Sequence, residues 1–214
     1  MTVDLYYHPA SGPARAVIMT AKCLGIDLNL KYVDLFAGEH MKPEFLKMNP
    51  QHTVPTIDDN GFYLWESRAV CTYLVNKYSP DSPLYPKDPK ERALVDRLLY
   101  FDIGTLYKAE LEYMYPILFL GKAGDPEKKE AYEKTVAFLE EFLSKTPYVA
   151  GDHLTVADLS ILASLTFAEL DDFSYAAYPK ITAWLNKMKS EVPDFKEINE
   201  IPLNEFREAL KSRK

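Results

Sequence analysis

The chain is poor in cysteine, and the cysteines that it has are arranged neither for metal binding nor for a disulfide framework. Among its 214 residues only Cys23 and Cys71 are cysteines, and no C-x-x-C pair or Cys/His cluster occurs. Disulfide-rich secreted domains and zinc modules need denser, characteristic spacings. We therefore expect no metal site and a reducing compartment such as the cytoplasm.

Long apolar runs, a targeting segment and an excess of positive charge are also missing. No stretch approaches the ~18 residues of a membrane span. The first residues, MTVDLYYHPASG, have neither the basic nor the apolar part of a signal peptide. A net charge of −7 argues against nucleic acid as a partner, because phosphate binding requires a basic face. A soluble protein without a membrane or nucleic-acid partner is expected.

The N-terminal part of the chain predicts alternating strands and helices. Asn60-Gly61 lies between two short strand patterns and is a strong hairpin signal. The order β-α-β-α-β-β-α predicts an α/β domain whose mixed, four-stranded sheet carries helices on its faces. The strands are expected at residues 3–7, 28–33, 54–57 and 62–65, the helices at 13–24 and 67–78, and a helical turn at 43–48.

A proline-rich segment separates this part from an all-helical part. Residues 79–89 (SPDSPLYPKDP) contain four prolines and are predicted to be a linker. Helical periodicity then predicts helices at 91–112, 126–144, 155–170, 178–192 and 203–213, with Pro116 interrupting the chain after the first. The predicted domains are residues 1–79, a linker at 80–89, and a helical domain at 90–214.

Ser11 lies between the first strand and the first helix and has two interpretations. A serine at this place is often the N-cap of the helix that follows. The same place suits anion stabilisation, because free amides and the positive end of the helix dipole point there. A hydroxyl that donates to a thiolate needs no base, whereas a serine nucleophile does. A hydrolase is disfavoured, since no G-x-S-x-G motif occurs.

Pro55 opens a predicted strand within QHTVPT and again allows two interpretations. Proline gives no amide to a sheet ladder, so an edge strand is one. The other is a cis Val54-Pro55 bond that exposes the N–H and C=O of Val54 to an extended peptide ligand.

A third polar group follows the last predicted strand, in the sequence Trp65-Glu66-Ser67-Arg68. A cap and a first-turn acid are common at a helix start. The carboxylate, hydroxyl and guanidinium together also suit a zwitterion, with the acid on an ammonium and the other two groups on a carboxylate. His40 and His52 could recognise a second carboxylate, although each can also be an ordinary surface residue.

In order and spacing, these features resemble the cytosolic glutathione S-transferases over essentially the whole chain. The segments LYYHPASGPARAVIMTAK, GEHMKPEFLKMNPQHTVPT, LWESRAVCTYLVNKY and RLLYFDIGTLY look like those of the insect delta class. The helical part adds GDHLTVAD, in which Thr155 and Asp158 match a capping box. The resemblance implies a thioredoxin-like N-terminal domain, an all-α C-terminal domain and glutathione as co-substrate.

The resemblance also implies roles for individual residues. Ser11 would donate to the glutathione sulfur, and Val54 would bind the cysteinyl backbone beside cis Pro55. Glu66 and Ser67 would hold the γ-glutamyl end with Arg68 nearby, and His40 and His52 would face the glycyl carboxylate. The electrophile pocket is expected between the domains, lined by Ala10, Pro13, Leu35, Tyr107, Glu110, Tyr113, Tyr115, Phe119 and Phe206.

Glu110 departs from the aromatic residue that delta-type sequences usually carry. A carboxylate beside an apolar pocket is costly unless it is paired or solvated. Either Glu110 points outward, or the pocket prefers electrophiles with a polar or cationic part. At the C-terminus, residues 204–214 could cover the pocket with Phe206.

The expected function is conjugation of glutathione to small hydrophobic electrophiles in xenobiotic or insecticide detoxification. The same thiolate could instead reduce organic hydroperoxides, and the aromatic pocket could serve a non-catalytic carrier of hydrophobic ligands. A disulfide reductase is disfavoured because the loop around Ser11 has no cysteine. The resemblance further implies a homodimer, with Tyr100, Phe101 and Asp102 as candidate contact residues.

Overall fold

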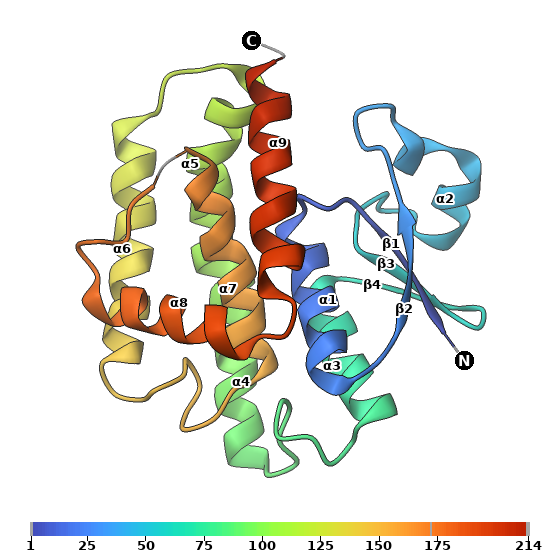
Figure 1. Ribbon diagram of the computed structural model, residues 1–214, viewed down its shortest axis with the longest axis horizontal. Helices are drawn as coiled ribbons and strands as arrows, with labels where there is room; N and C mark the ends of the chain where they lie inside the picture. Colours follow the sequence, from blue (N-terminus) through green and yellow to red (C-terminus); the bar gives the residue numbers. More distant parts are fainter. Residues whose placement is uncertain (1, 172, 213–214) are drawn as a thin grey trace.

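A computed structural model describes residues 2–171 and 173–212 of the chain (Figure 1). The N-terminal part contains a sheet and helices in the predicted order. Its elements are β1 (Val3–Tyr7), α1 (Gly12–Leu24), β2 (Leu28–Tyr32), the 3₁₀ turn η1 (Glu39–Met41), α2 (Pro43–Met48), β3 (Thr56–Asp59), β4 (Phe62–Trp65) and α3 (Ser67–Tyr78).

The sheet has four strands in the order β2-β1-β3-β4, and it is mixed as predicted. β1 runs parallel to β2 and antiparallel to β3, and β3 pairs antiparallel with β4. Leu5 of β1 lies opposite Leu30 on one side and Ile57 on the other, and both Leu5 and Ile57 are fully buried. The third strand begins at Thr56, two residues later than expected, because Pro55 has no N–H for the ladder.

Asp59 fastens the β3–β4 hairpin to α3. Its Oδ2 accepts hydrogen bonds from the hydroxyls of Tyr73 and Tyr78, each at 2.7 Å, and from Nζ of Lys77 at 2.6 Å. Burial opposes ionisation of this carboxyl, but the donors outweigh that effect and lower its pKa. The hairpin is therefore held to the helix by a charged, well-satisfied acceptor.

The helical part begins at Pro89. Among the described residues its elements are α4 (Pro89–Phe101), a π-helical turn η2 (Asp102–Leu106), α5 (Tyr107–Leu120), α6 (Pro126–Leu143), α7 (Val156–Ala168), the 3₁₀ turn η3 (Glu169–Asp171), α8 (Pro179–Glu191), a π-helical turn η4 (Lys196–Glu200) and α9 (Ile201–Lys211). The fold is thus a thioredoxin-like sheet part followed by an all-α part. Arg213 and Lys214, which end the predicted last helix and C-terminal segment, lie outside the described residues.

The prediction of an interruption at Pro116 is wrong. Pro116 lies inside α5, which runs on to Leu120 and ends at Gly121 in the left-handed conformation. An interior proline loses one hydrogen bond of the helix ladder and crowds the carbonyl four residues before it, at a cost of about 3 kcal/mol. The packing of α5 on its neighbours, including Met114 in the core, offsets that cost. The regular helix changes instead at Asp102–Leu106, where a π-helical turn places the Asp102 side chain in the interior.

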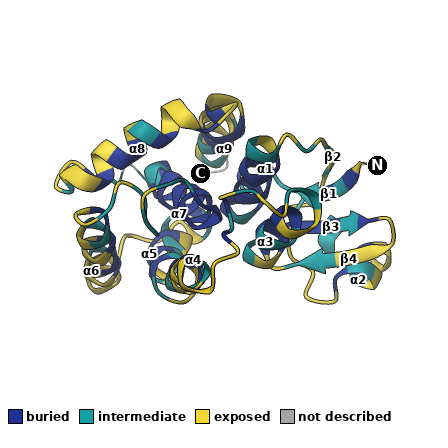
Figure 2. Ribbon diagram, turned by 90° about the horizontal axis from the view of Figure 1, so that it is seen from below, coloured by how far each residue is buried: buried dark blue, intermediate teal, exposed yellow. Residues whose placement is uncertain are grey.

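The centre of the helical part is α7, whose residues are all buried (Figure 2). Its start is fixed by Asp158, whose Oδ2 accepts from the backbone N–H and the hydroxyl of Thr155, each at 2.9 Å. Oδ1 of Asp158 also accepts from the Val149 N–H and the Trp184 Nε1–H. The predicted capping box is therefore present, and its acid also joins two further segments.

α1 joins the two parts of the molecule. Figure 1 shows α1 and α3 between the sheet and the helices of the C-terminal part. Arg15 of α1 is fully buried and donates to Thr166 and Asn199 at 2.7 Å and to the Ala163 carbonyl at 3.0 Å. Within the described ranges, no helix combines the length and the apolar character that crossing a bilayer requires.

Candidate active site

The turn from β1 into α1 carries Ser11. The Ser11 N–H donates to the His8 carbonyl at 2.9 Å, and Ser11 is the N-cap residue of α1. Its Oγ accepts a hydrogen bond from the Ala14 N–H at 3.3 Å. Capping uses a lone pair of the hydroxyl and leaves its hydrogen available, so the cap and the donor interpretations are compatible.

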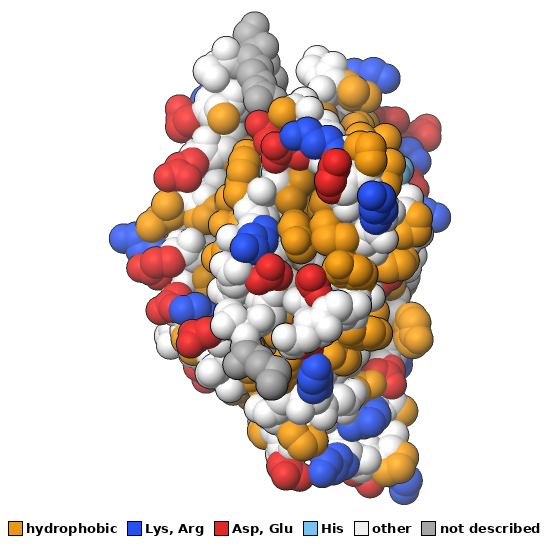
Figure 3. Space-filling model, turned by 90° about the vertical axis from the view of Figure 1, so that its right-hand side faces the viewer, with side chains coloured by type: hydrophobic (Ala, Val, Ile, Leu, Met, Phe, Trp, Pro, Cys, Tyr) orange, Lys and Arg blue, Asp and Glu red, His pale blue; other side chains and the backbone are white. Residues whose placement is uncertain are grey.

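Ser11 lies on the wall of a cavity of about 610 Å³ between the sheet part and the helical part. Phe36 lines this cavity and is also 48% exposed, so the cavity opens to the surface. Figure 3 shows a continuous area of apolar side chains, bordered by charges, on the side of the molecule that carries the sheet. The predicted residues on the cavity wall are Ala10, Ser11, Pro13, Leu35, His40, His52, Val54, Tyr107, Tyr115, Phe119 and Phe206.

A second, smaller cavity of about 220 Å³ adjoins the first. Pro13, Thr53, Val54 and Tyr107 line both, so the two form one depression with two arms. The remaining predicted residues are on this second wall: Pro55, Glu66, Ser67 and Arg68. The structure thus brings together Ser11 and every predicted glutathione-binding residue, although Ser11 and Ser67 are more than fifty positions apart in the chain.

The Val54-Pro55 peptide bond is cis, as the second interpretation of this segment expects. The loop before it is held by Asn49, which is fully buried. Asn49 Nδ2 donates to the Thr53 carbonyl at 3.1 Å and to the Thr56 Oγ1 at 2.9 Å. Trp65 Nε1 donates to Gln51 Oε1 from the neighbouring strand. These bonds fix the backbone that presents Val54 to the cavity.

Glu66 has an unusual backbone conformation at the start of α3. Its φ of 66° and ψ of 97° lie in a region that residues other than glycine rarely adopt. Such a conformation costs about 1–3 kcal/mol and persists only where the surroundings impose it. The side chain of Glu66 is exposed at the smaller cavity, while Ser67 beside it is buried. A negative group therefore faces that cavity, beside a hydroxyl.

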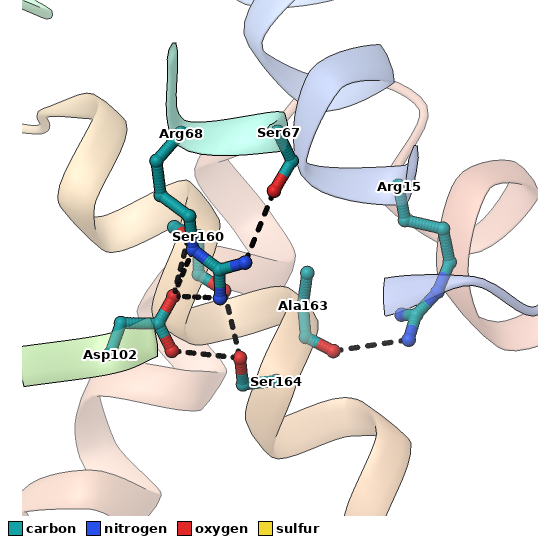
Figure 4. A network of polar contacts seen from close by, with 7 residues as sticks. All are labelled: Arg15, Ser67, Arg68, Asp102, Ser160, Ala163 and Ser164. Atoms are coloured by element: carbon teal, nitrogen blue, oxygen red, sulfur yellow. Dashed lines mark hydrogen bonds and ion pairs between the residues drawn. The ribbon is translucent and has the colours of Figure 1, made fainter. Parts of the chain in front are cut away.

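Arg68 does not extend freely into the smaller cavity, because its guanidinium is bound to Asp102 (Figure 4). Nη2 lies 2.6 Å and Nε 3.1 Å from Asp102 Oδ2, and Nη1 donates to Ser67 Oγ at 3.1 Å. Burial opposes the charge of Arg68, but the contacts with Asp102 outweigh it and raise its pKa. The guanidinium of Arg68 therefore also positions the Ser67 hydroxyl at the smaller cavity.

Asp102 is the centre of this network and not a surface residue, which corrects its assignment as a candidate contact residue. It is fully buried and accepts from Ser160 Oγ at 2.5 Å and from Ser164 Oγ at 2.8 Å. Figure 4 shows Arg68 and Arg15 on opposite sides of the α7 segment that carries these serines. The fully buried Arg15 and the half-buried Arg68 thus lie on either side of α7.

The two histidines lie together at the larger cavity. The rings of His40 and His52 are 6.0 Å apart, and Nδ1 of His40 is buried without a hydrogen-bond partner among the described residues. The loop that carries His40 is organised by Asp34, whose N–H donates to Glu39 Oε2 and whose Oδ1 accepts from the Phe36 N–H. An acceptor such as a carboxylate would satisfy the histidine pair.

The cavity wall formed by α5 has a simple helical spacing. Tyr107, Leu111, Tyr115 and Phe119 recur every four residues and line the larger cavity. The rings of Tyr115 and Phe119 are 4.9 Å apart, and that of Phe119 lies 6.1 Å from Phe206 on α9. Three of the four were predicted, and the spacing itself would have added Leu111.

Tyr113 and Glu110, also predicted for the pocket, are not on its wall. Tyr113 is buried and stacks on Tyr132 of α6 at 6.4 Å. Glu110 is wholly buried, so it neither points outward nor faces an electrophile. Both residues lie on the side of α5 turned away from the cavity, because they are out of phase with the four-residue spacing of the wall.

The carboxyl group of Glu110 has no hydrogen-bond partner among the described residues. Burial raises its pKa well above the usual value, and nearby Asp102 acts in the same direction. Arg15 and Arg68 oppose this shift without reversing it. Burial therefore favours the protonated, neutral form of this carboxyl in the folded protein.

Sequence reasoning missed some of the cavity wall. His8, Gly12, Phe36, Thr53, Leu111 and Phe167 line the larger cavity in addition to the predicted residues. Gly12, Phe36 and Thr53 are direct neighbours of predicted residues in the chain, and His8 lies two residues before Ala10, so sequence proximity could have found them. Phe167 belongs to α7, whose residues are all buried, so burial does not distinguish it from its neighbours in that helix. In the described portion of the chain, no three acidic, histidine or cysteine side chains are grouped as metal ligands are.

Comparisons with known proteins agree with this geometry. Residues 5–83 match the family described as glutathione S-transferase, N-terminal domain, and residues 119–197 match glutathione S-transferase, C-terminal domain. A delta-class glutathione transferase of Nilaparvata lugens is 48% identical, with 99% of this chain and 100% of that chain covered and a TM-score of 0.95.

Two further solved structures extend this likeness. A glutathione transferase of Bombyx mori is 44% identical, covers 97% of each chain and has a TM-score of 0.94. An epsilon-class glutathione S-transferase from the housefly, Musca domestica, is 38% identical, covers 99% of this chain and 98% of that chain, and has a TM-score of 0.91.

Proposed function

Because the chain belongs to the glutathione S-transferase family and is a glutathione transferase, we propose that Ser11 activates glutathione for conjugation to small hydrophobic electrophiles. One observation carries this proposal. The Ser11 hydroxyl accepts from the Ala14 N–H at the start of α1 and keeps its own hydrogen at the wall of the larger cavity. A sulfur bound there would receive a hydrogen bond from the hydroxyl and the positive end of the helix dipole.

The magnitudes are sufficient without a general base. A free thiol has a pKa near 8.5, and lowering it by about two units requires roughly 2.7 kcal/mol of preferential thiolate stabilisation. A hydrogen bond to a charged group contributes about 1.5–3 kcal/mol, and a helix N-terminus about 0.3–1 kcal/mol. The thiolate would then attack an electrophilic carbon and form a thioether.

The two arms of the depression suit the two ends of glutathione. In the smaller arm, Glu66 would bind the ammonium of the γ-glutamyl group and Ser67 its carboxylate, with the Ser67 hydroxyl oriented by Arg68. Val54 would bind the cysteinyl backbone as a neighbouring strand does. His40 and His52 together would bind the glycyl carboxylate, which supplies the acceptor that His40 Nδ1 lacks among the described residues.

The aromatic wall suits a hydrophobic electrophile. Tyr107, Tyr115, Phe119 and Phe206 line the same cavity as Ser11, and the volume of this cavity is within the usual range of small-ligand sites. We assign the protein to detoxification of such compounds in the cytoplasm. Reduction of organic hydroperoxides would use the same thiolate, and assays with both substrate types decide between the two activities.

Pairing of two subunits is part of this proposal. Tyr100 on α4 is 75% exposed, and Leu94 of α4 and Ile103 of the turn that follows it are also exposed large apolar residues. Burial of such side chains against a second copy of the chain would remove apolar surface from water. Light scattering at micromolar concentration should give the mass of a dimer, and a monomer would contradict the pairing.

The test of the proposed activity is the Ser11→Ala variant. With an aromatic halide as electrophile, kcat at neutral pH should fall by about ten- to a hundredfold while the KM for glutathione changes little, because the donor acts on the thiolate and not on peptide binding. The matched control is Ser190→Ala, because Ser190 is an exposed serine on α8, far along the chain from the residues that line the cavity. Unchanged turnover of Ser11→Ala would refute the role of Ser11.

A further inference from the structure

His8 is a polar cavity residue without a part in the function proposed so far. It follows β1 directly and shares one turn with Ser11, whose N–H donates to the His8 carbonyl at 2.9 Å. Both residues line the larger cavity. The turn therefore fixes the imidazole relative to the hydroxyl that is proposed to hold the sulfur.

The protonation of the imidazole follows from its hydrogen bonding. Nδ1 of His8 accepts from the Ala10 N–H at 3.3 Å, so in the neutral ring the proton is on Nε2. No partner for Nε2 is found among residues 2–171 and 173–212. Burial lowers the pKa of His8, and the opposing effect of Asp34 is smaller. His8 is thus a neutral ring that offers one N–H.

Aromatic side chains hold this ring in place. Its centroid lies 5.8 Å from that of Tyr32, 6.2 Å from that of Phe36 and 5.7 Å from that of Phe206. Phe36 and Phe206 line the same cavity, so the imidazole of His8 lies beside two apolar rings of the cavity wall. A donor held among apolar rings acts more strongly on an acceptor than a donor surrounded by water does.

We propose that the His8 Nε2–H binds the acceptor oxygen of the electrophile and that the site therefore favours α,β-unsaturated carbonyl compounds. In such a compound the carbonyl oxygen lies three bonds from the attacked carbon. One residue of the turn can thus hold the sulfur while another receives the oxygen. This inference deepens the proposed function and rests on it.

The reaction balances with these two groups and solvent. The electron pair of the glutathione thiolate forms the C–S bond at the β-carbon, and the π electrons of the C=C bond move to give an enolate. Negative charge develops on the carbonyl oxygen, where the His8 N–H stabilises it more than in the ground state. The α-carbon then takes a proton from water, and the product is a saturated thioether carbonyl compound.

The experiment compares two electrophiles that differ in the acceptor. One is the enone 4-phenyl-3-buten-2-one, and the other is benzyl chloride, which has no acceptor oxygen and loses chloride on attack. The readout is the ratio of the two kcat/KM values. His8→Phe keeps an aromatic ring and removes the donor, and we expect the ratio to fall about tenfold, mainly through kcat for the enone.

Further variants make the outcome specific. His8→Gln supplies an amide donor and should restore most of the wild-type ratio of the two kcat/KM values, whereas His8→Met has no such donor and should not. If His8→Phe does not fold, the comparison of His8→Gln with His8→Met replaces it as the test. The inference is overturned if the ratio of the two kcat/KM values is unchanged in His8→Phe. It is also overturned if the ratio falls in Tyr115→Phe instead, because the donor to the enone would then be the Tyr115 hydroxyl. If the wild-type protein converts neither electrophile, the proposed conjugation fails, which is distinguishable from a failure of the His8 assignment.

Discussion

The buried carboxyl of Glu110 gives a sharp prediction about stability and pH. Its oxygens have no hydrogen-bond partner among the described residues, and the Ala168 backbone opposes the effect of burial on its pKa without reversing it. Burial raises the pKa of the folded-state carboxyl well above that of the unfolded chain, which is near 4.3. The perturbation is Glu110→Gln, which keeps the shape and removes the titration.

The sign of the effect follows from proton linkage. Below about pH 4 the carboxyl is protonated in both states and contributes no pH dependence. Above that pH the unfolded chain releases the proton and the folded protein retains it, so the free energy of unfolding decreases. The decrease is about 1.4 kcal/mol for each pH unit over which the folded-state group stays protonated. Glu110→Gln should therefore gain stability relative to wild type as the pH rises.

The assay is urea unfolding of wild type and Glu110→Gln at several pH values between 4 and 8. Glu112→Gln is the matched control, because Glu112 is exposed, pairs with Lys128 at 2.7 Å and has a lowered pKa. That variant should show no gain with rising pH. Parallel stability curves for wild type and Glu110→Gln would refute the reasoning and indicate an ionised carboxylate paired with Arg15.

Three further predictions concern the fold and the cavity. Asp158→Ala should lower the free energy of unfolding by about 3–5 kcal/mol in urea titrations, because several buried donors, including the Thr155 N–H, lose their acceptor. A loss below about 1 kcal/mol would contradict the capping role of Asp158. Asp59→Asn should clearly lower the free energy of unfolding at pH 7. The difference in this free energy between variant and wild type should shrink as the pH falls below about 4, because the folded-state pKa of Asp59 is lowered. A difference that does not depend on pH would argue against the ion pair with Lys77. Tyr115→Ala should raise the KM for aromatic electrophiles several-fold without changing the KM for glutathione. If both KM values rise equally, Tyr115 contributes to glutathione binding as well as to the electrophile wall.

The features that could be predicted from sequence are those fixed by nearby residues. Ser11 as the cap of α1, the Asn60-Gly61 hairpin, and the Thr155–Asp158 box each depend on residues within a few positions of one another. Local chemistry decides such features, because the partners are brought together by the turn itself.

The features that could not be predicted depend on the phase of a helix or on partners far along the chain. Asp102 binds Arg68, Ser160 and Ser164, which are 34 to 62 residues away, so its burial has no local signal. Glu110 was assigned to the pocket from its place among aromatic residues, but its phase on α5 turns it toward the interior. A one-residue change in helical phase moves a side chain by about 100°.

The most direct test of the account is the pKa of the glutathione thiol when it is bound to the protein. It can be read from the ultraviolet absorbance of the thiolate in the binary complex, titrated in wild type and in Ser11→Ala. A wild-type pKa about two units below that of free glutathione is predicted, together with a return most of the way to the free value in Ser11→Ala. An equally low thiol pKa in both proteins would contradict the role of the Ser11 hydroxyl as the donor that stabilises the thiolate.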